Sequence, residues 1–244
     1  ETSFFHVHTY RCGHAEDIPD EAYVKQAIAC GASDIWFTDH APFPGDPFGA
    51  RMRYAELDEY LETLTALREK YRDIRIHIGL ETEYFPSFDK SGYYAHLRSI
   101  PELEILLLGQ HMAETSASPL TYSFSMQWDE LMQNEYKLLG HAIVQGIRSG
   151  YFDAVAHPDR ILRRYDTWDD GTQAVSAEII QAADEAGLPL EMNLCSAETS
   201  IYYKREFWQL VPDSVGRIIG YDAHSVYEMR SRHQGMRKRL QVFT

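Results

Sequence analysis

Two histidines stand two positions apart near the start of this 244-residue chain, in His6-Val7-His8. If the segment is a β-strand, both imidazoles project from the same face, because side chains alternate between the two faces along a strand. Neutral imidazoles suit Zn²⁺, Mn²⁺ or Fe²⁺, so such a pair can begin a metal site. A single His-x-His pair fits ordinary packing equally well, and the rest of the chain must decide between the two interpretations.

Further imidazoles and carboxylates recur where short apolar segments end. With the first pair they form the set His6, His8, His40, Glu81, His111, His157, Asp222 and His224. In an α/β barrel the C-terminal ends of the strands form one rim, and functional residues collect there. Closely spaced imidazoles and carboxylates would be electrostatically costly without a cation between them. The spacing therefore predicts divalent metal ions at the mouth of a barrel.

The elements that would hold these residues alternate along the chain. Apolar runs typical of buried parallel strands occupy residues 4–7, 34–38, 74–82, 105–108, 153–156, 190–193 and 217–221. Amphipathic segments typical of helices occupy residues 20–30, 54–71, 128–149, 172–186, 205–211 and 225–240. Alternation of this kind predicts βα units with right-handed crossovers. A closed or nearly closed barrel is favoured over an open sheet, with residues 1–244 as one domain, because ligand candidates come from every part of the chain.

Composition excludes several classes of function. The formal net charge of −14 argues against general nucleic-acid binding, which needs a basic surface. The chain contains no run of 18 apolar residues, so we expect neither a transmembrane helix nor a membrane partner. Three scattered cysteines (Cys12, Cys30 and Cys195) fit a reducing cytoplasm better than a disulfide framework. The oligomeric state stays open.

Some suggestive residues are assigned to structure rather than to chemistry. His77 lies four residues deeper in its strand than Glu81, where it would fill the barrel. Other histidines fall within helical patterns, namely His96, His141 and His233. Cys12 and Cys195 lie near the predicted rim, yet we expect them to be small buried residues rather than ligands or nucleophiles.

The ordered motifs resemble those of the PHP (polymerase and histidinol phosphatase) superfamily, and within it most closely the stand-alone histidinol-phosphatases. The resemblance rests on His6-Val7-His8, residues 9–15, Thr38-Asp39-His40, Gly79-Leu80-Glu81, Gly109-Gln110-His111, Ala156-His157-Pro158-Asp159 and Asp222-Ala223-His224. It covers essentially the whole chain. It implies a distorted (β/α)₇ barrel of the PHP type, in agreement with the seven strands counted above.

The resemblance also implies a site for two or three divalent metal ions (Zn, Mn or Fe). A first metal would take His6, His8, Glu81 and Asp222; a second, His111, His157 and the shared Glu81; a third, His14, His40 and His224. Two metals bridged by Glu81 would lie about 3.5–4 Å apart and hold a hydroxide that attacks a phosphomonoester, such as L-histidinol phosphate. Because the ligand set is complete, a decayed, non-catalytic metal-binding module is disfavoured.

Other residues are candidates for the substrate and for proton transfer. Arg160, Arg163 and Arg164 follow His157 on the rim loop, where an arginine can clamp phosphate through two parallel hydrogen bonds. Asp39 and Asp159 adjoin metal ligands, and either can orient an imidazole or supply the proton for the leaving group. An ammonium-bearing substrate also needs an acid, for which Glu114, Asp159 and Glu198 are the candidates by position.

Two positions depart from the family pattern and leave the substrate open. Tyr221 stands where a small residue is common, and the segment at residues 194–207 differs from a strict histidinol-phosphatase. By strand alternation from Asp222, we expect Tyr221 to face the helix layer. The alternatives are a PHP-type phosphodiesterase or nuclease and a phosphatase of another small phosphomonoester. Glu83 is the fallback if Glu81 does not bridge the metals, since it shares the same strand parity.

Overall fold

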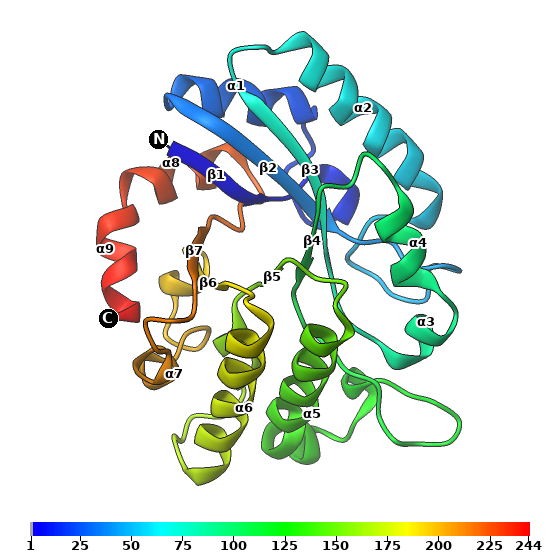
Figure 1. Cartoon of the computed structure of the whole chain (residues 1–244), viewed down its shortest axis with the longest axis vertical. Helices are drawn as coiled ribbons and strands as arrows, with labels where there is room; N and C mark the ends of the chain where they lie inside the picture. Colours follow the sequence, from blue (N-terminus) through cyan, green and yellow to red (C-terminus); the bar gives the residue numbers. More distant parts are fainter. Residues whose placement is uncertain (1) are drawn as a thin grey trace.

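Seven parallel strands follow one another around a barrel in sequence order (Figure 1). The computed structural model describes residues 2–244. The strands are β1 (Thr2–Val7), β2 (Ala32–His40), β3 (Arg75–Thr82), β4 (Ile105–Leu108), β5 (Ala154–Val155), β6 (Leu190–Asn193) and β7 (Arg217–Gly220). The predicted (β/α)₇ barrel is confirmed. It is distorted at β5, which spans two residues and pairs with β6 only through Val155 and Leu190.

The first and last strands close the barrel through the segments that carry ligand candidates. A parallel bridge joins Val7 to Ala223, just beyond the end of β7. The Tyr221 backbone N–H donates to the Phe5 carbonyl (2.8 Å), and the Ala223 N–H donates to the His6 carbonyl (3.1 Å). Closure therefore brings the beginning and the end of the chain to the same side of the rim.

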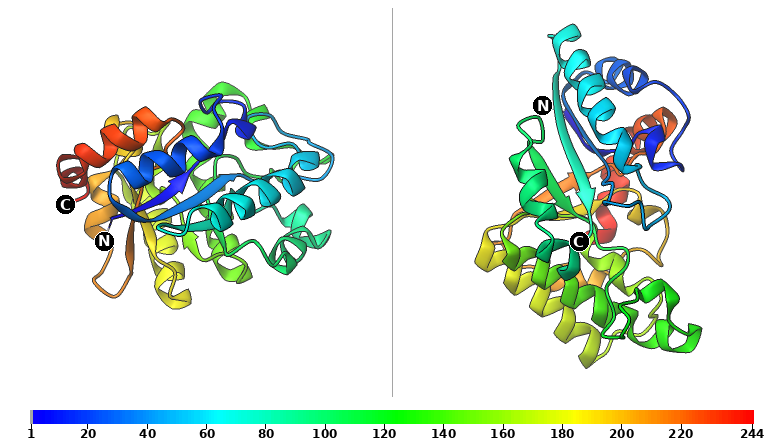
Figure 2. Two further views of the ribbon diagram at one scale, coloured as in Figure 1. Left: turned by 90° about the horizontal axis from the view of Figure 1, so that it is seen from above. Right: turned by 90° about the vertical axis from the view of Figure 1, so that its right-hand side faces the viewer.

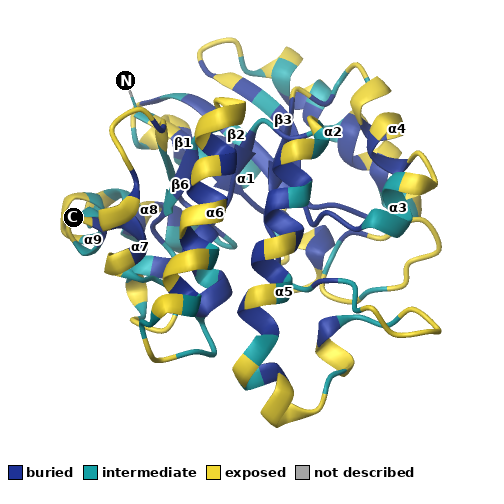
Figure 3. Cartoon of the chain, turned by 60° about the horizontal axis from the view of Figure 1, so that its bottom comes forward, coloured by how far each residue is buried: buried dark blue, intermediate teal, exposed yellow. Residues whose placement is uncertain are grey.

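Helices cover the outside of the strands in all three ribbon views (Figures 1 and 2). The longer ones are α1 (Asp20–Ala29), α2 (Leu57–Lys70), α5 (Trp128–Ser149) and α6 (Asp170–Ala186), and the shorter α7 (Arg205–Leu210) follows them. Buried and exposed residues alternate in stripes along α5 and α6 (Figure 3), as amphipathic helices on a barrel require. None of the helices in the described part of the chain has the length and apolarity needed to cross a membrane.

Two predictions for the helices need correction. The single helix predicted at residues 225–240 is two helices, α8 (Val226–Gln234) and α9 (Met236–Leu240), because the chain breaks at Gly235, a poor helix former. Two short helices, α3 (Pro86–Lys90) and α4 (Tyr93–Ser99), were outside the predicted ranges. Five and seven residues are too few for a hydrophobic period to become visible.

Inside the barrel, side chains from four strands form a small apolar floor beneath the rim. Leu107, Ala154 and Ala156 are buried together, and Phe5 and Ile218 pack against them. Because the interior is filled below this level, the polar residues at the strand ends face a shallow mouth and not a pore.

Candidate metal centre

Glu81, at the end of β3, lies at the centre of the rim. Its Oε2 atom is 3.2 Å from His6 Nε2 and 3.5 Å from His8 Nε2. The same oxygen is 3.3 Å from His40 Nδ1, while Oε1 is 2.8 Å from His157 Nε2. One carboxylate thus meets imidazoles from the ends of three other strands, with its two oxygens facing different groups.

The remaining predicted ligands complete the cluster. His111 Nε2 is 3.7 Å from Glu81 Oε1, and His224 Nδ1 is 3.7 Å from Asp222 Oδ1. The ring of His14 has its centroid 4.7 Å from that of His224. All nine side chains proposed from the sequence therefore lie in one connected group, buried at its base and open to solvent at His14.

Several buried atoms of this cluster have no hydrogen-bond partner among the described residues. They are His6 Nε2, both ring nitrogens of His8, Glu81 Oε2 and His224 Nε2. Buried polar atoms are nearly always satisfied, so this concentration needs an explanation. Four overlapping groups have donor atoms close enough to share an ion: His6–His8–Glu81, His40–Glu81–His111, His8–His40–His224 and Cys12–His14–His224. Imidazole nitrogens and carboxylate oxygens together suit divalent metals of intermediate softness, such as Zn²⁺, Mn²⁺ and Fe²⁺.

The pKa values of the imidazoles in the cluster are shifted in opposite directions by burial and by neighbouring carboxylates. Burial alone would lower the pKa of His8, but the nearby carboxylates of Asp222 and Asp39 raise that pKa to about 9. Burial and the neighbouring charge of His8 hold the pKa of His40 well below its usual value. Burial lowers the pKa of His157 to about 4. A metal ion that binds these nitrogens would have to displace any proton that they hold.

The backbone is strained at three of the ligand candidates. His6, His157 and Asp222 have positive φ angles of 69°, 29° and 49°, which non-glycine residues seldom adopt. Glycine makes room nearby, because a Cβ at Gly109 would overlap the carboxylate of Glu81. Strain that persists in a folded chain is held by its surroundings and clusters at functional sites.

Three carboxylates hold imidazoles of the cluster from behind. Asp39 Oδ1 lies 3.4 Å from His8 Nδ1, a position from which it can orient that ring, as the sequence suggested. Glu83 Oε1 lies 3.3 Å from His111 Nδ1. The third acid is Glu191, which the sequence analysis missed. The available signal was a charged residue in the middle of an apolar strand.

A cavity of about 420 Å³ opens over the cluster and is lined by arginines. Arg160 donates through Nη2 to Asp222 Oδ2 (2.8 Å), and Arg163 donates through Nη2 to the His111 carbonyl (3.2 Å). Both face the cavity. Arg164 does not line it and instead donates to Glu135 (2.8 Å), so its assignment to the substrate is corrected.

A third arginine on the cavity wall was missed by the sequence analysis. Arg51 belongs to the loop after β2, forms an ion pair with Glu83 and has an Nε without a hydrogen-bond partner among the described residues. No spacing in the sequence marked it, because that loop has no regular period. It adds a further positive charge to the cavity that Arg160 and Arg163 also line.

The acids suggested for other roles are engaged elsewhere. Asp159 Oδ2 accepts hydrogen bonds from the Lys204 backbone N–H (2.9 Å) and Trp208 Nε1 (3.0 Å). It therefore ties the loop to α7 and makes no hydrogen bond to an imidazole of the cluster within the described chain. Glu114 accepts from Ser87, and Glu198 pairs with Arg232. None of the three lines the cavity, so none is placed to receive a substrate's ammonium group.

The four histidines set aside by the sequence analysis lie away from the cluster. His77 is at the opposite end of β3, His96 and His141 are exposed, and His233 Nδ1 pairs with the hydroxyl of Tyr221 (3.1 Å). Tyr221 is buried against Phe4 in the helix layer, which confirms its predicted direction. Cys12 is buried as predicted, although it lies within reach of His14 and His224. The same prediction was wrong for Cys195, which is half-buried and lines the cavity.

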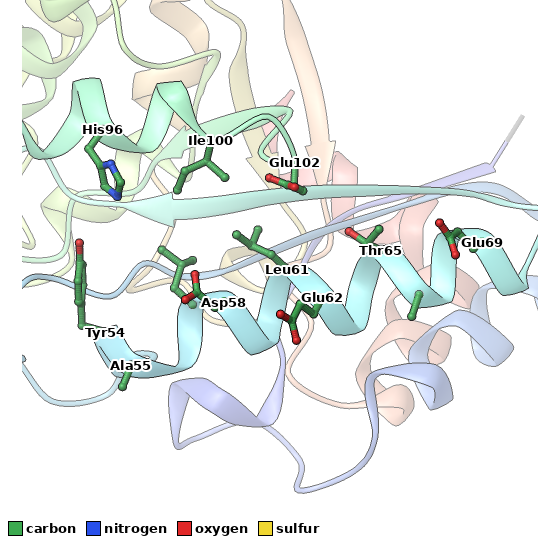
Figure 4. A pocket seen from close by; sticks show the side chains of 12 residues that line it. Tyr54, Ala55, Asp58, Leu61, Glu62, Thr65, Glu69, His96, Ile100 and Glu102 are labelled. Atoms are coloured by element: carbon green, nitrogen blue, oxygen red, sulfur yellow. The ribbon is translucent and has the colours of Figure 1, made fainter.

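A larger hollow of about 830 Å³ lies on the outer surface between α2 and α4 (Figure 4). There His96 and Ile100 face Asp58 and Leu61 across an open groove. Its walls offer no group of residues with metal-ligand spacing within the described chain. Size therefore does not identify the functional site, whereas the convergence of unpartnered ligand atoms does.

Comparison with known proteins agrees with this geometry. The model of the PHP domain family matches residues 5–194, and the chain belongs to this family. A protein described as a probable histidinol-phosphatase, from Deinococcus radiodurans, is 27% identical over 239 residues, covering 93% of this chain and 88% of the relative. The histidinol-phosphatase of Lactococcus lactis is 26% identical over 198 residues, covering 78% and 70%.

Two solved structures share the fold. A putative histidinol phosphatase from Listeria monocytogenes superposes with a TM-score of 0.76 at 16% identity, covering 96% of this chain and 99% of its own. A histidinol phosphate phosphatase from Lactococcus lactis, complexed with zinc, L-histidinol and phosphate, gives a TM-score of 0.71 at 20% identity, covering 97% and 93%. At these identities the similarity establishes the barrel architecture.

Proposed function

We propose that this protein is a metal-dependent phosphomonoesterase that hydrolyses L-histidinol phosphate to L-histidinol and phosphate. The observation that carries the proposal is the set of buried, unpartnered ligand atoms beneath an arginine-lined cavity. Support also comes from relatives named histidinol-phosphatase that span most of the chain. The zinc, L-histidinol and phosphate of the Lactococcus lactis structure fit the same chemistry.

The proposed cofactors are three divalent ions, Zn, Mn or Fe, held by the nine side chains assigned above. Bound metals of this kind supply a nucleophilic water at neutral pH and offset charge on phosphoryl oxygens. Glu81 is the bridging acid in this scheme, because each of its oxygens faces different imidazoles. Asp222 faces His8 on one side and Arg160 on the other, so it links the metal ligands to the anion-binding wall.

Arg160 and Arg163 are proposed to hold the phosphate, with Arg51 as a third cationic group. Each is paired with an acid in the absence of substrate: Asp222, Glu135 and Glu83 respectively. These pairs fix the guanidinium groups before binding, which limits the entropy lost when a phosphate enters. Asp39 keeps its proposed role as the acid that orients His8.

The test compares substrates and metals. We expect kcat/KM for L-histidinol phosphate to exceed that for glycerol phosphate by well over tenfold. Chelation should abolish turnover, and restoring Zn²⁺ or Mn²⁺ should recover it. Equal kcat/KM values for the two substrates would indicate a generic phosphatase and not a histidinol-phosphatase. Full activity in the metal-free protein would refute the metal centre.

A second candidate is a phosphatase of another small phosphomonoester, favoured by one feature of the cavity. Asp222 is the only carboxylate that lines it among the described residues, and that acid is engaged by Arg160. The described residues that line the cavity thus include no unpaired carboxylate to bind the ammonium group of L-histidinol phosphate. A strongly anionic substrate turned over faster than L-histidinol phosphate would favour this candidate.

The phosphodiesterase alternative is addressed by comparing p-nitrophenyl phosphate with its bis-ester. A cavity of about 420 Å³ suits a small ligand better than a nucleic-acid strand. We propose that residues 1–244 act as one PHP domain and that the enzyme works in the cytoplasm. The three unpaired cysteines are compatible with that reducing compartment.

A further inference from the structure

Strand β6 supplies no predicted metal ligand, yet one of its side chains lies directly behind the cluster. Glu191 is fully buried in the middle of this strand. Its Oε1 atom is 2.6 Å from His6 Nδ1. Its Oε2 atom accepts the backbone N–H of His157 and the side-chain amide of Asn193, both at 2.9 Å. Both carboxylate oxygens are therefore committed.

The two histidines that Glu191 holds are both strained. His6 has φ 69° and His157 has φ 29°. A positive φ is costly for a non-glycine residue and persists only where the surroundings enforce it. Glu191 contacts the first through its ring and the second through its backbone. In the proposed ligand scheme these histidines belong to different metals.

The fold makes room for this carboxylate. A Cβ at Gly220 of β7 would overlap the carboxylate of Glu191, so glycine is required there for packing. Asn193 extends the arrangement, since its Nδ2 also lies 3.2 Å from Asp222 Oδ2. Its Oδ1 accepts from Arg160 Nη2 at 3.1 Å. Strand β6 thus carries an interior pair of polar residues that contacts three of the ligand candidates.

We infer that Glu191 is a positioning residue that fixes His6 and His157 at once and so couples two of the three metal positions. Accepting the proton on Nδ1 of His6 leaves the lone pair on Nε2, which points toward Glu81 and has no hydrogen-bond partner in the described chain. Partners of this kind set the tautomer and orientation of a metal-binding imidazole. The inference rests on the metal-centre part of the proposed function and is independent of the substrate.

The test is Glu191→Gln, with metal affinity as the readout. The amide keeps one acceptor but turns an N–H₂ group toward either the His6 ring or the two N–H donors at Oε2. We expect affinity for two metals per chain to fall by about 10–100-fold, measured by equilibrium dialysis against Zn²⁺ or Mn²⁺ and elemental analysis. The metal-free variant should retain its near-ultraviolet circular dichroism spectrum.

Two matched variants sharpen the result. Glu178→Gln changes an exposed acid on α6 and should bind metals like the parent. Glu83→Gln removes the acid behind His111 alone and should weaken one metal. Weakening of two sites by Glu191→Gln against one by Glu83→Gln supports the inference. Parental affinity, or weakening of a single site in Glu191→Gln, overturns it.

If Glu191→Gln does not fold, Glu191→Asp carries the test. It keeps the charge but withdraws the carboxylate by one methylene, so the same two sites should weaken while the metal-free protein stays folded. A one-site or unchanged pattern in this variant again overturns the inference. Poor turnover of L-histidinol phosphate by a parent that binds all its metals would refute the substrate and leave this inference intact.

Discussion

The two ends of the barrel both carry histidines and acids, but they treat them differently. At the N-terminal end, His77 pairs with Glu104 through Nδ1 (2.6 Å) and with Asp34 through Nε2 (3.2 Å). Its ring stacks on Trp36 with centroids 3.7 Å apart. At the C-terminal rim, His6 and His8 each have a ring nitrogen without a hydrogen-bond partner in the described chain.

This contrast separates a structural histidine from a ligand. His77 and Glu81 share one strand and one face, four residues apart, so neither residue type nor parity distinguishes them. Their surroundings do, because every polar atom of the His77 ring is satisfied, while Glu81 Oε2 is buried without a hydrogen-bond partner among described residues.

The largest effect is expected from Glu81→Gln. The amide removes the charge that offsets two cations and leaves a poor bridging ligand. We expect kcat to fall by about three orders of magnitude and at least one metal per chain to be lost by elemental analysis. Glu83→Gln, next on the same face, should cost only about tenfold in metal affinity, since Glu83 acts through His111. Equal losses in the two variants would contradict the central role of Glu81.

A smaller loss is expected from Arg160→Met. Charge-assisted hydrogen bonds contribute about 1.5–3 kcal/mol, so kcat/KM should fall by about 100-fold, mainly through KM, at saturating metal. The matched control is Arg164→Met, whose guanidinium pairs with Glu135 away from the cavity. It should stay within a few-fold of the parent. Similar losses in both variants would place the phosphate elsewhere on the loop.

The residues that the sequence revealed share a simple property. Strand ends meet at one rim in an α/β barrel, so an apolar run followed by His, Glu or Asp predicts both position and neighbours. That logic predicts from the sequence alone that His6, Glu81 and Asp222 lie together. It also predicted the direction of Tyr221, because alternation along a strand is a local rule.

The residues that the sequence missed or misassigned depend on loops and on contacts across the barrel. Arg51 enters the cavity from an irregular loop, and Glu191 reaches His6 across 185 positions of sequence. Asp159 adjoins a ligand candidate in sequence, yet its side chain points to Trp208. Sequence neighbours of a ligand can face either way where the chain turns, so adjacency alone did not determine their roles.

The structural role of Asp159 predicts a change in pH dependence. Burial raises the pKa of Asp159 to about 6 from an unfolded value near 3.8. The folded state holds this proton more tightly, so stability falls as pH rises from about 4 to 6 and stays lower above that. Asp159→Asn removes the titration. The stability of the variant minus that of the parent, both metal-free, should rise by up to about 3 kcal/mol between pH 4 and 7.

Denaturant unfolding at several pH values measures this difference. A constant cost from placing an amide beside Trp208 cancels, because only the change with pH is compared. Metal content and kcat should stay within a few-fold of the parent, since no hydrogen bond in the described chain joins Asp159 to the cluster. A pH-independent difference, or a hundredfold loss of kcat, would restore Asp159 as a candidate for proton transfer.

The smallest effect is expected from His77→Gln, which tests the other end of the barrel. The change removes the stacking on Trp36 and one of the two hydrogen bonds that the ring makes to Glu104 and Asp34, while Asp34 keeps its ion pair with Arg75. The free energy of unfolding should fall by about 1 kcal/mol, which lowers Tm by about 2–4 °C. Metal content and kcat should be unchanged.

The counterpart at the rim, His40→Gln, should do the reverse: it should lose metal while the metal-free protein keeps its Tm, because burial already holds the pKa of His40 low and no proton-dependent pairing is lost. If His77→Gln lost metal, or if His40→Gln unfolded the metal-free chain, hydrogen-bond saturation would not separate structural histidines from ligands in this barrel.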